Sequence, residues 1–218
     1  MTTKISLLHH TIQYDRCALS YKHKIEEFAK KTKNQNVLDV GCGFGNYTSL
    51  FLHSNNSVHG LDIEDLRLKE HKGFFHKLYD GYKFPYPSNF FDTVTCFDVI
   101  EHIKHDTYTI SEIYRVLRPN GQVFLATPNR HRLASLIKIL LWKKDKFPKI
   151  MQIKGIGGKS IHVREYTAYE LHTLFKQIHF RNIHLSPLWL GLRGKINIGA
   201  EVNLFPTFAH TLFIHAVK

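Results

Sequence analysis

Residues 37–45 read Val-Leu-Asp-Val-Gly-Cys-Gly-Phe-Gly, an apolar run that leads directly into a glycine-rich loop. The run predicts a short buried strand, and the residues from Asn46 onward predict a helix that buries Leu50 and Phe51. Glycines between a strand and a helix let the backbone approach a ligand, and the helix N-terminus offers free N–H groups. Tight strand-to-helix turns also use glycine for steric reasons, so the loop needs support from the residues around it.

Strand and helix patterns alternate on both sides of this loop. Apolar residues at helical spacing predict a helix over residues 16–31, and Thr167-Ala-Tyr-Glu170 has the spacing of a capping box. The alternation predicts an α/β fold with a mostly parallel sheet covered by helices on both faces. The expected helices span 16–31, 106–117 and 168–178, and the other expected strands span 57–61, 91–97, 122–127, 182–186 and 210–217, with a turn at 118–121.

Two acidic residues indicate what the loop binds. Asp62 ends the second expected strand, 17 residues after Gly45, which is the spacing of an acid that hydrogen-bonds ribose hydroxyls. Asp39 precedes the first glycine by two residues. A carboxylate at that position would repel a pyrophosphate but suits a ligand with a cationic amino-acid end. The pair favours a nucleoside ligand of this kind over a dinucleotide.

The motifs together resemble those of class I S-adenosylmethionine-dependent methyltransferases. The resemblance covers residues 35–129, where the motifs occur in the same order as in the family. The segment 163–171 extends it. It implies a Rossmann-like fold with six parallel strands and a final antiparallel strand, seven in all, and an enzyme that uses S-adenosylmethionine. The matching segments are residues 37–45, Gly60-Leu-Asp62, Asp80 with 84–92, residues 117–129 and residues 163–171.

The resemblance also assigns cofactor-binding roles to individual residues. Asp39 and the backbone of the glycine loop would hold the methionine end of the cofactor, and Asp62 would bind the ribose hydroxyls. Ile63 would pack on the adenine, whose edge Asp80 and the Gly81 N–H would contact. The remaining implied contacts are the loop residues Gly41, Cys42, Gly43 and Gly45, and Phe97 on the methionine side.

A polar cluster, Asp98-Val-Ile-Glu101-His102, follows the fourth expected strand directly. It resembles the Glu-x-x-Glu-His segment of ubiquinone-biosynthesis O-methyltransferases and of small-RNA 2′-O-methyltransferases, with the shorter Asp98 in the first position. His162 falls where those families supply a further histidine. Three roles stay open for Asp98, Glu101 and His102: a structural role, general-base catalysis by His102, or a metal site for which Mg²⁺ is the candidate.

Positive charge is concentrated in one segment. The chain carries a net charge of +12, and residues 130–164 contain ten Lys or Arg against one acid, Asp145. Residues 128–166 fall outside the strand–helix alternation, so we interpret them as an insertion within a single domain spanning residues 1–218. Its apolar helical face predicts a lid or peripheral membrane contact through 130–164, with RNA binding as the alternative. The face comprises Leu133, Leu136, Ile137, Leu140 and Leu141.

Composition sets the broad class of the protein. A hydrophobic fraction of 43% and a charged fraction of 22% exclude general disorder. No apolar run reaches the ~20 residues of a membrane span, and three cysteines without a CxxC pair suit a reducing, cytoplasmic location. We expect methyl transfer to a hydroxyl of a small, lipidic or glycan acceptor. The alternatives are an RNA methyltransferase or a non-catalytic module that binds the cofactor or RNA.

Overall fold

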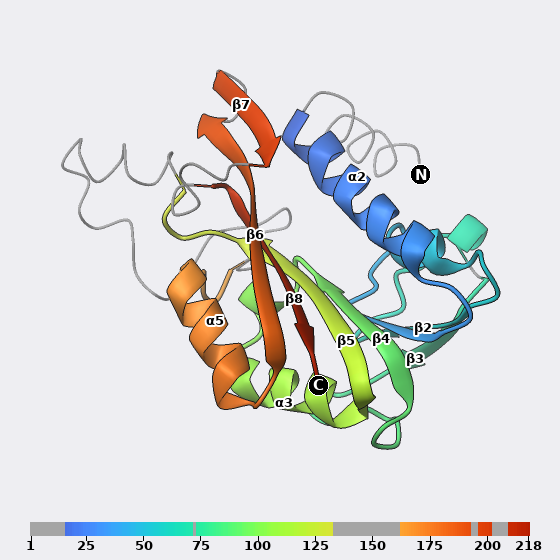
Figure 1. Cartoon of the computed structure of the whole chain (residues 1–218). Helices are drawn as coiled ribbons and strands as arrows, with labels where there is room; N and C mark the ends of the chain where they lie inside the picture. The colour runs from blue at the N-terminus through green and yellow to red at the C-terminus, as the bar shows by residue number, and fades with distance from the viewer. Residues whose placement is uncertain (1–15, 72, 133–161, 193–195, 202–208) are drawn as a thin grey trace.

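The computed structural model describes residues 16–71, 73–132, 162–192, 196–201 and 209–218. The described chain contains one eight-stranded sheet with helices packed against it (Figure 1). The strands are β1 Asn36–Val40, β2 Ser57–Asp62, β3 Phe75–Leu78, β4 Phe91–Phe97, β5 Leu117–Pro128, β6 Arg181–Leu192, β7 Ile196–Glu201 and β8 Thr211–Val217. The α-helices are α2 Arg16–Lys31, α3 Asp106–Val116 and α5 Ala168–Gln177, and the 3₁₀ helices are η1 Thr48–Phe51, η2 Lys69–His71 and η3 Ile100–His102.

The strand order is β3-β2-β1-β4-β5-β8-β6-β7. The first five strands in this order are mutually parallel, and β8 runs antiparallel to both of its neighbours, β5 and β6. This confirms the predicted arrangement of six parallel strands and one antiparallel strand. The structure adds β7, which pairs antiparallel with β6 at the edge. Its sequence, Ile-Asn-Ile-Gly-Ala-Glu, carries an interior glycine that weakens the strand pattern.

Alternate residues of the central strands enter two separate cores. Leu38 and Val40 of β1 pack on the side of α3 and α5, whereas Val37 packs on the side of α2. Side chains alternate across a strand, so one apolar run supplies both cores. Figure 1 shows α2 on one side of the sheet and α3 with α5 on the other, as predicted.

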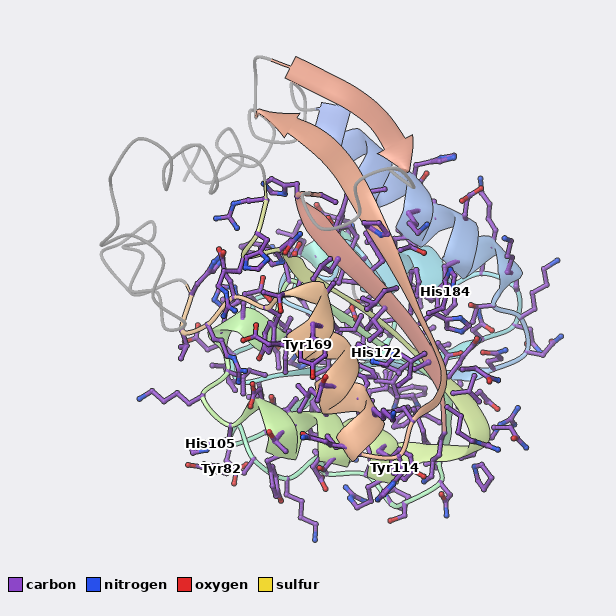
Figure 2. All side chains as sticks on the ribbon, turned by 60° about the vertical axis from the view of Figure 1, so that its left-hand side comes forward. Tyr82, His105, Tyr114, Tyr169, His172 and His184 are labelled. Carbon is purple, nitrogen blue, oxygen red and sulfur yellow. The ribbon has the colours of Figure 1, made fainter. Side chains whose placement is uncertain are left out.

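The three α-helices lie where the apolar spacing predicted them. On α2 the buried face includes Ile25, and on α3 it includes Ile110 and Ile113. Helix α5 begins at a complete capping box between Thr167 and Glu170. Its outward face carries Tyr169, which is 79% exposed (Figure 2).

The predicted helix from Asn46 is wrong in type and length. Only the 3₁₀ helix η1 forms there, although Phe51 is fully buried as expected. The run His53-Ser-Asn-Asn56 follows almost at once, and both Ser54 and Asn55 adopt positive φ. An α-helix of so few residues cannot recover the cost of its nucleation.

The chain around the predicted insertion is anchored at both flanks. Asn129 forms a parallel bridge with Tyr166, and the Arg130 N–H donates to the Tyr166 carbonyl at 2.8 Å. Residues 133–161, which include the predicted amphipathic face, lie outside the described residues. Among the residues the structure describes, no helix has the length and apolar character needed to cross a membrane.

Candidate active site

The glycine loop joins β1 to η1 at the carboxyl edge of the parallel strands. The sheet order reverses between β1 and β4, and such switch points are where open α/β sheets bind ligands. Gly41 and Gly43 both adopt positive φ, at 73° and 47°. A Cβ on Gly41 would clash with the Val99 side chain and lie 2.8 Å from its Cγ1, whereas a Cβ on Gly43 would meet no atom of the described residues within 4 Å. Gly41 therefore permits close packing, and the described chain leaves space beside Gly43.

Asp39 lies buried at the base of this loop. Its carboxylate accepts hydrogen bonds from the Thr48 hydroxyl at 2.5 Å and the Thr95 hydroxyl at 2.8 Å. Burial outweighs these hydrogen bonds and raises the pKa of Asp39 to about 6. A cationic group bound nearby would offset the cost of keeping this carboxylate ionised.

Of the two other predicted cofactor acids, Asp62 is the last residue of β2 and Asp80 follows β3. The two strands pair through Asp62 and Leu78. One Asp62 carboxylate oxygen accepts from the Gly43 N–H at 2.8 Å, and the other accepts from the Ile63 N–H at 2.7 Å. The Ile63 side chain is 61% exposed. Asp62 is thus fixed directly beside the glycine loop.

Asp80 and Gly81 come two and three residues after β3, at the same edge of the sheet as Asp62. The exposed Asp80 carboxylate accepts from the Tyr82 N–H at 2.9 Å. Within the part of the chain that the structure describes, a Cβ on Gly81 would meet no atom within 4 Å. Both residues are accessible in the way that contact with an adenine edge requires.

Cys42 and Phe97 contribute to packing on the α2 side of the sheet. The Phe97 ring lies 5.7 Å from the Tyr47 ring and 5.9 Å from the Phe124 ring, between ring centroids. Cys42 is buried beside Gly60, and burial raises the pKa of its thiol. Their predicted contacts with a cofactor stay predictions.

Asp98 follows β4 with a φ of 55°, a left-handed conformation that non-glycine residues rarely adopt. Asp98 is exposed, yet neighbouring protein atoms crowd its carboxyl and raise its pKa to about 6, against the opposing effects of the Tyr21 hydroxyl and His162. Tyr21 comes from α2, and among the described residues its buried hydroxyl has no hydrogen-bond partner. Sequence patterns placed Tyr21 on the apolar helix face, so its approach to Asp98 was missed.

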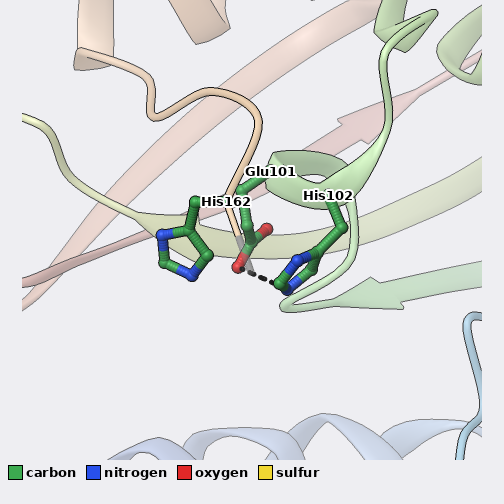
Figure 3. Close-up of side chains that lie close together, drawn as sticks. All are labelled: Glu101, His102 and His162. Carbon is green, nitrogen blue, oxygen red and sulfur yellow. Dashed lines mark ion pairs between the residues drawn. The ribbon is translucent and has the colours of Figure 1, made fainter. Parts of the chain in front are cut away.

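Three side chains converge next to Asp98. Ligand atoms of Glu101, His102 and His162 all lie within 4.8 Å of one another (Figure 3), and Asp98 is outside this group of atoms. Glu101 and His102 belong to η3, and His162 comes from the far flank of the 133–161 segment. The structure therefore joins two of the three predicted metal ligands with the histidine that resemblance added, rather than with Asp98.

The electrostatics of these three residues favour a bound cation. Glu101 is 1% exposed and accepts one hydrogen bond from the Thr127 hydroxyl at 3.0 Å. Burial and then the Asp98 charge raise the pKa of Glu101 to about 8. Burial and then His162 lower the pKa of His102 to about 4, so its imidazole is neutral near pH 7. A buried carboxylate beside the neutral His102 imidazole and the His162 ring is a donor set that a divalent cation would stabilise.

Two residues that the sequence did not single out support His162. Glu165 is fully buried, with one carboxylate oxygen 3.1 Å from His162 Nδ1 and the other 2.6 Å from an Arg132 guanidinium nitrogen. Burial opposes ionisation of Glu165, but the hydrogen bonds from His162 and Arg132 hold its pKa below the ordinary value. Glu165 lies three residues after His162 in a segment that is not helical. Outside a helix this spacing does not predict that the two side chains meet, so no pattern in the sequence indicates the contact.

The chain is similar in sequence and in fold to known methyltransferases. The sequence model of a family described as a methyltransferase domain matches residues 10–185. The chain belongs to this methyltransferase domain family. Solved structures show the same fold: a SAM-dependent methyltransferase from Archaeoglobus fulgidus superposes with a TM-score of 0.67 at 17% identity, covering 99% of this chain and 100% of that one. An S-adenosylmethionine-dependent methyltransferase from Mesorhizobium loti gives 0.66 at 14% identity, with coverages of 91% and 98%.

Curated relatives of this chain include a ubiquinone biosynthesis O-methyltransferase of Pseudomonas entomophila. It is 33% identical over 116 residues, which are 48% of this chain and 49% of the relative. A ubiquinone biosynthesis O-methyltransferase of Pseudomonas aeruginosa is 32% identical over the same length. The chain thus spans about half the length of these relatives. The predicted class I methyltransferase family and fold are confirmed.

Proposed function

We propose that this chain transfers a methyl group from S-adenosylmethionine to a hydroxyl of a small, lipid-like or glycan acceptor, with a divalent cation held by Glu101, His102 and His162. The observation that carries the proposal is the convergence of these three side chains within 4.8 Å. Val99, two residues before Glu101, packs against Gly41 of the glycine loop. The cofactor cradle and the cluster are therefore adjacent.

The residues around the loop fit the cofactor. S-adenosylmethionine carries its methyl group on a positively charged sulfur, which makes the transfer downhill. Asp39, with its raised pKa, would stabilise the cationic methionine end, and Asp62 would accept from the ribose hydroxyls. Open space at Gly43 and Gly81 leaves room for the backbone to approach the ligand.

The cluster fits a cation in the same way. Glu101, His102 and His162 offer one oxygen and two nitrogens, a mixed set that suits divalent metals. A bound cation would lower the pKa of a coordinated hydroxyl and favour its attack on the methyl group. Asp98, exposed beside the cluster, would orient the acceptor or take its proton.

The proposed acceptor class rests on the names of the curated relatives. The curated relatives are named as O-methyltransferases of ubiquinone biosynthesis, whose name specifies transfer to oxygen. This supports a hydroxyl oxygen of a small lipid-like molecule as the methyl acceptor, in preference to a nitrogen or a carbon atom. A nucleic-acid hydroxyl stays the alternative acceptor.

Methyl-labelled S-adenosylmethionine tests the proposal. The enzyme is incubated with fractionated lipid, glycan and RNA extracts, with chelator alone or with excess Mg²⁺ or Mn²⁺, and labelled product is counted. We expect label in the organic phase or in the glycan fraction, loss of turnover in chelator and recovery with metal. Full turnover in chelator would refute the cation, and label confined to RNA would refute the acceptor class.

Two variants separate the roles of the cluster. Glu101→Gln should abolish metal-dependent turnover, while binding of S-adenosylhomocysteine stays unchanged. The matched control is Glu170→Gln. Glu170 lies on α5, its carboxylate pairs with Arg130, and the variant should retain turnover. If His102→Ala is slow but its remaining turnover is still lost in chelator and recovered with metal, His102 acts as a general base instead of a ligand.

A further inference from the structure

The orientation of His162 is fixed from outside the cluster. Its Nδ1 lies 3.1 Å from an oxygen of Glu165, on the opposite side of the ring from Nε2. The imidazole also lies 5.1 Å from the His102 ring, between centroids, at an interplanar angle of 73°. His162 therefore contacts a buried carboxylate on one side and the cluster on the other.

A carboxylate beside one ring nitrogen selects the histidine tautomer. An ionised carboxylate only accepts hydrogen bonds, so the nitrogen that faces it must carry the proton. In the neutral imidazole the one ring proton then resides on Nδ1, and Nε2 keeps the lone pair with which it could bind a cation. Ligand histidines in metalloproteins commonly donate their second N–H to a carboxylate in this way.

Burial and an ion pair fix the Glu165 carboxylate beside His162 Nδ1. It is fully buried, and its second oxygen pairs with the Arg132 guanidinium at 2.6 Å. Arg132 also donates to the Asn129 carbonyl at 3.1 Å. On the other side, the N–H groups of Val163 and Arg164 donate to the Glu101 carbonyl at 2.7 and 3.1 Å. The segments before and after residues 133–161 therefore meet at His162.

We propose that Glu165, anchored by Arg132, is a positioning residue that holds His162 as its Nδ1–H tautomer and presents Nε2 to Glu101 and His102. The inference rests on the proposed function for its consequence in cation binding. The tautomer itself is a property of the chain alone.

Two measurements on Glu165→Gln test the inference. Long-range ¹H–¹⁵N correlation spectra of labelled protein report the tautomer, with His162 assigned through the signal missing in His162→Gln. We expect a single Nδ1–H form in the wild type and a mixture in Glu165→Gln. Titration with Mn²⁺, followed by electron paramagnetic resonance, should show affinity reduced about 10–100-fold in the variant.

The control is Glu170→Gln, which removes a comparable carboxylate whose hydrogen-bond partners among the described residues are Arg130 and Thr167. Glutamine keeps the capping box at that position. This control should retain the wild-type tautomer and Mn²⁺ affinity, and both variants should bind S-adenosylhomocysteine as the wild type does.

The outcomes separate the two proposals. An Nε2–H form or a mixture in the wild type, or an unchanged tautomer in Glu165→Gln, would overturn the positioning role. If the wild type binds no Mn²⁺ but shows the Nδ1–H form that Glu165→Gln loses, the positioning role stands and the cation in the proposed function falls.

Discussion

The buried carboxylate of Asp39 links ligand binding to stability. Its pKa is about 6 in the folded chain against 3.8 for an ordinary aspartate. The folded chain therefore binds more protons between these values, and its stability falls as the pH rises from about 4 to about 6. Above that window the charged group contributes a constant cost of about 1–3 kcal/mol.

Asp39→Asn removes this cost. Urea unfolding without cofactor should show the variant more stable than the wild type by about 1–3 kcal/mol at pH 7.5. The difference should shrink toward zero near pH 4, where the wild-type carboxyl is protonated. The same variant should bind S-adenosylhomocysteine more weakly. A stability difference that is equal at both pH values would contradict the burial argument.

Gly41 and Val99 should show coupled effects, because a Cβ on Gly41 would overlap the Val99 side chain. Gly41→Ala should destabilise the chain by about 2–4 kcal/mol, from overpacking and from its positive φ. Adding Val99→Ala should recover the overpacking part and leave about 1 kcal/mol of backbone strain. Additive effects in a double-mutant cycle by urea unfolding would show that the two residues do not meet.

Gly43 offers the matched comparison at the residue scale. A Cβ there meets no atom of the described residues within 4 Å, so Gly43→Ala should cost only the strain of its φ of 47°. Its larger effect should be on cofactor binding, because the added methyl group enters the open side of the loop.

At the scale of elements, helix α5 depends on its N-terminal cap. The Thr167 hydroxyl accepts from the Glu170 N–H at 3.2 Å, and the Glu170 carboxylate accepts from the Thr167 N–H at 3.0 Å. Thr167→Ala should therefore reduce the free energy of unfolding by about 1 kcal/mol. Calorimetry should show cofactor affinity unchanged, since α5 lies on the other side of the sheet from the α2 core. A loss of affinity would show that the cap acts on the site.

The helices and strands that are determined by their own residues could be predicted from the sequence. Helices α2, α3 and α5 follow from apolar spacing and a capping box, and the strands that carry Asp39, Asp62 and Phe97 follow from short apolar runs. The short η1 did not follow, because its length is set by the polar turn behind it and by the Thr48 contact with Asp39. The added strand β7 depends on pairing with β6, which no local pattern shows.

Contacts between segments distant in sequence explain what was missed in the site. Glu165 and Arg132 are 33 positions apart, and their ion pair exists only because the flanks of residues 133–161 meet. Tyr21 of helix α2 approaches Asp98, which follows strand β4 some 77 positions later in the chain. Sequence patterns could name Glu101 and His102 as a group because they are adjacent in one motif, but the third member of the cluster required a family resemblance.

At the scale of the whole molecule, the sheet brings the cofactor residues to one edge. β1 carries Asp39, β2 ends at Asp62, and β4 leads into Asp98 and the cluster. Parallel pairing of these strands aligns their carboxyl ends, so acids from three separate motifs surround one loop. The central claim is that this edge binds S-adenosylmethionine.

Isothermal titration with S-adenosylhomocysteine, in the wild type and in Asp62→Ala, tests that claim most directly. We predict one site of micromolar affinity in the wild type. Loss of the charge-assisted hydrogen bonds of Asp62 should weaken binding by about 1–3 kcal/mol in a variant that unfolds at the wild-type urea concentration. No heat of binding in the wild type, or comparable binding of NAD in its place, would contradict the account.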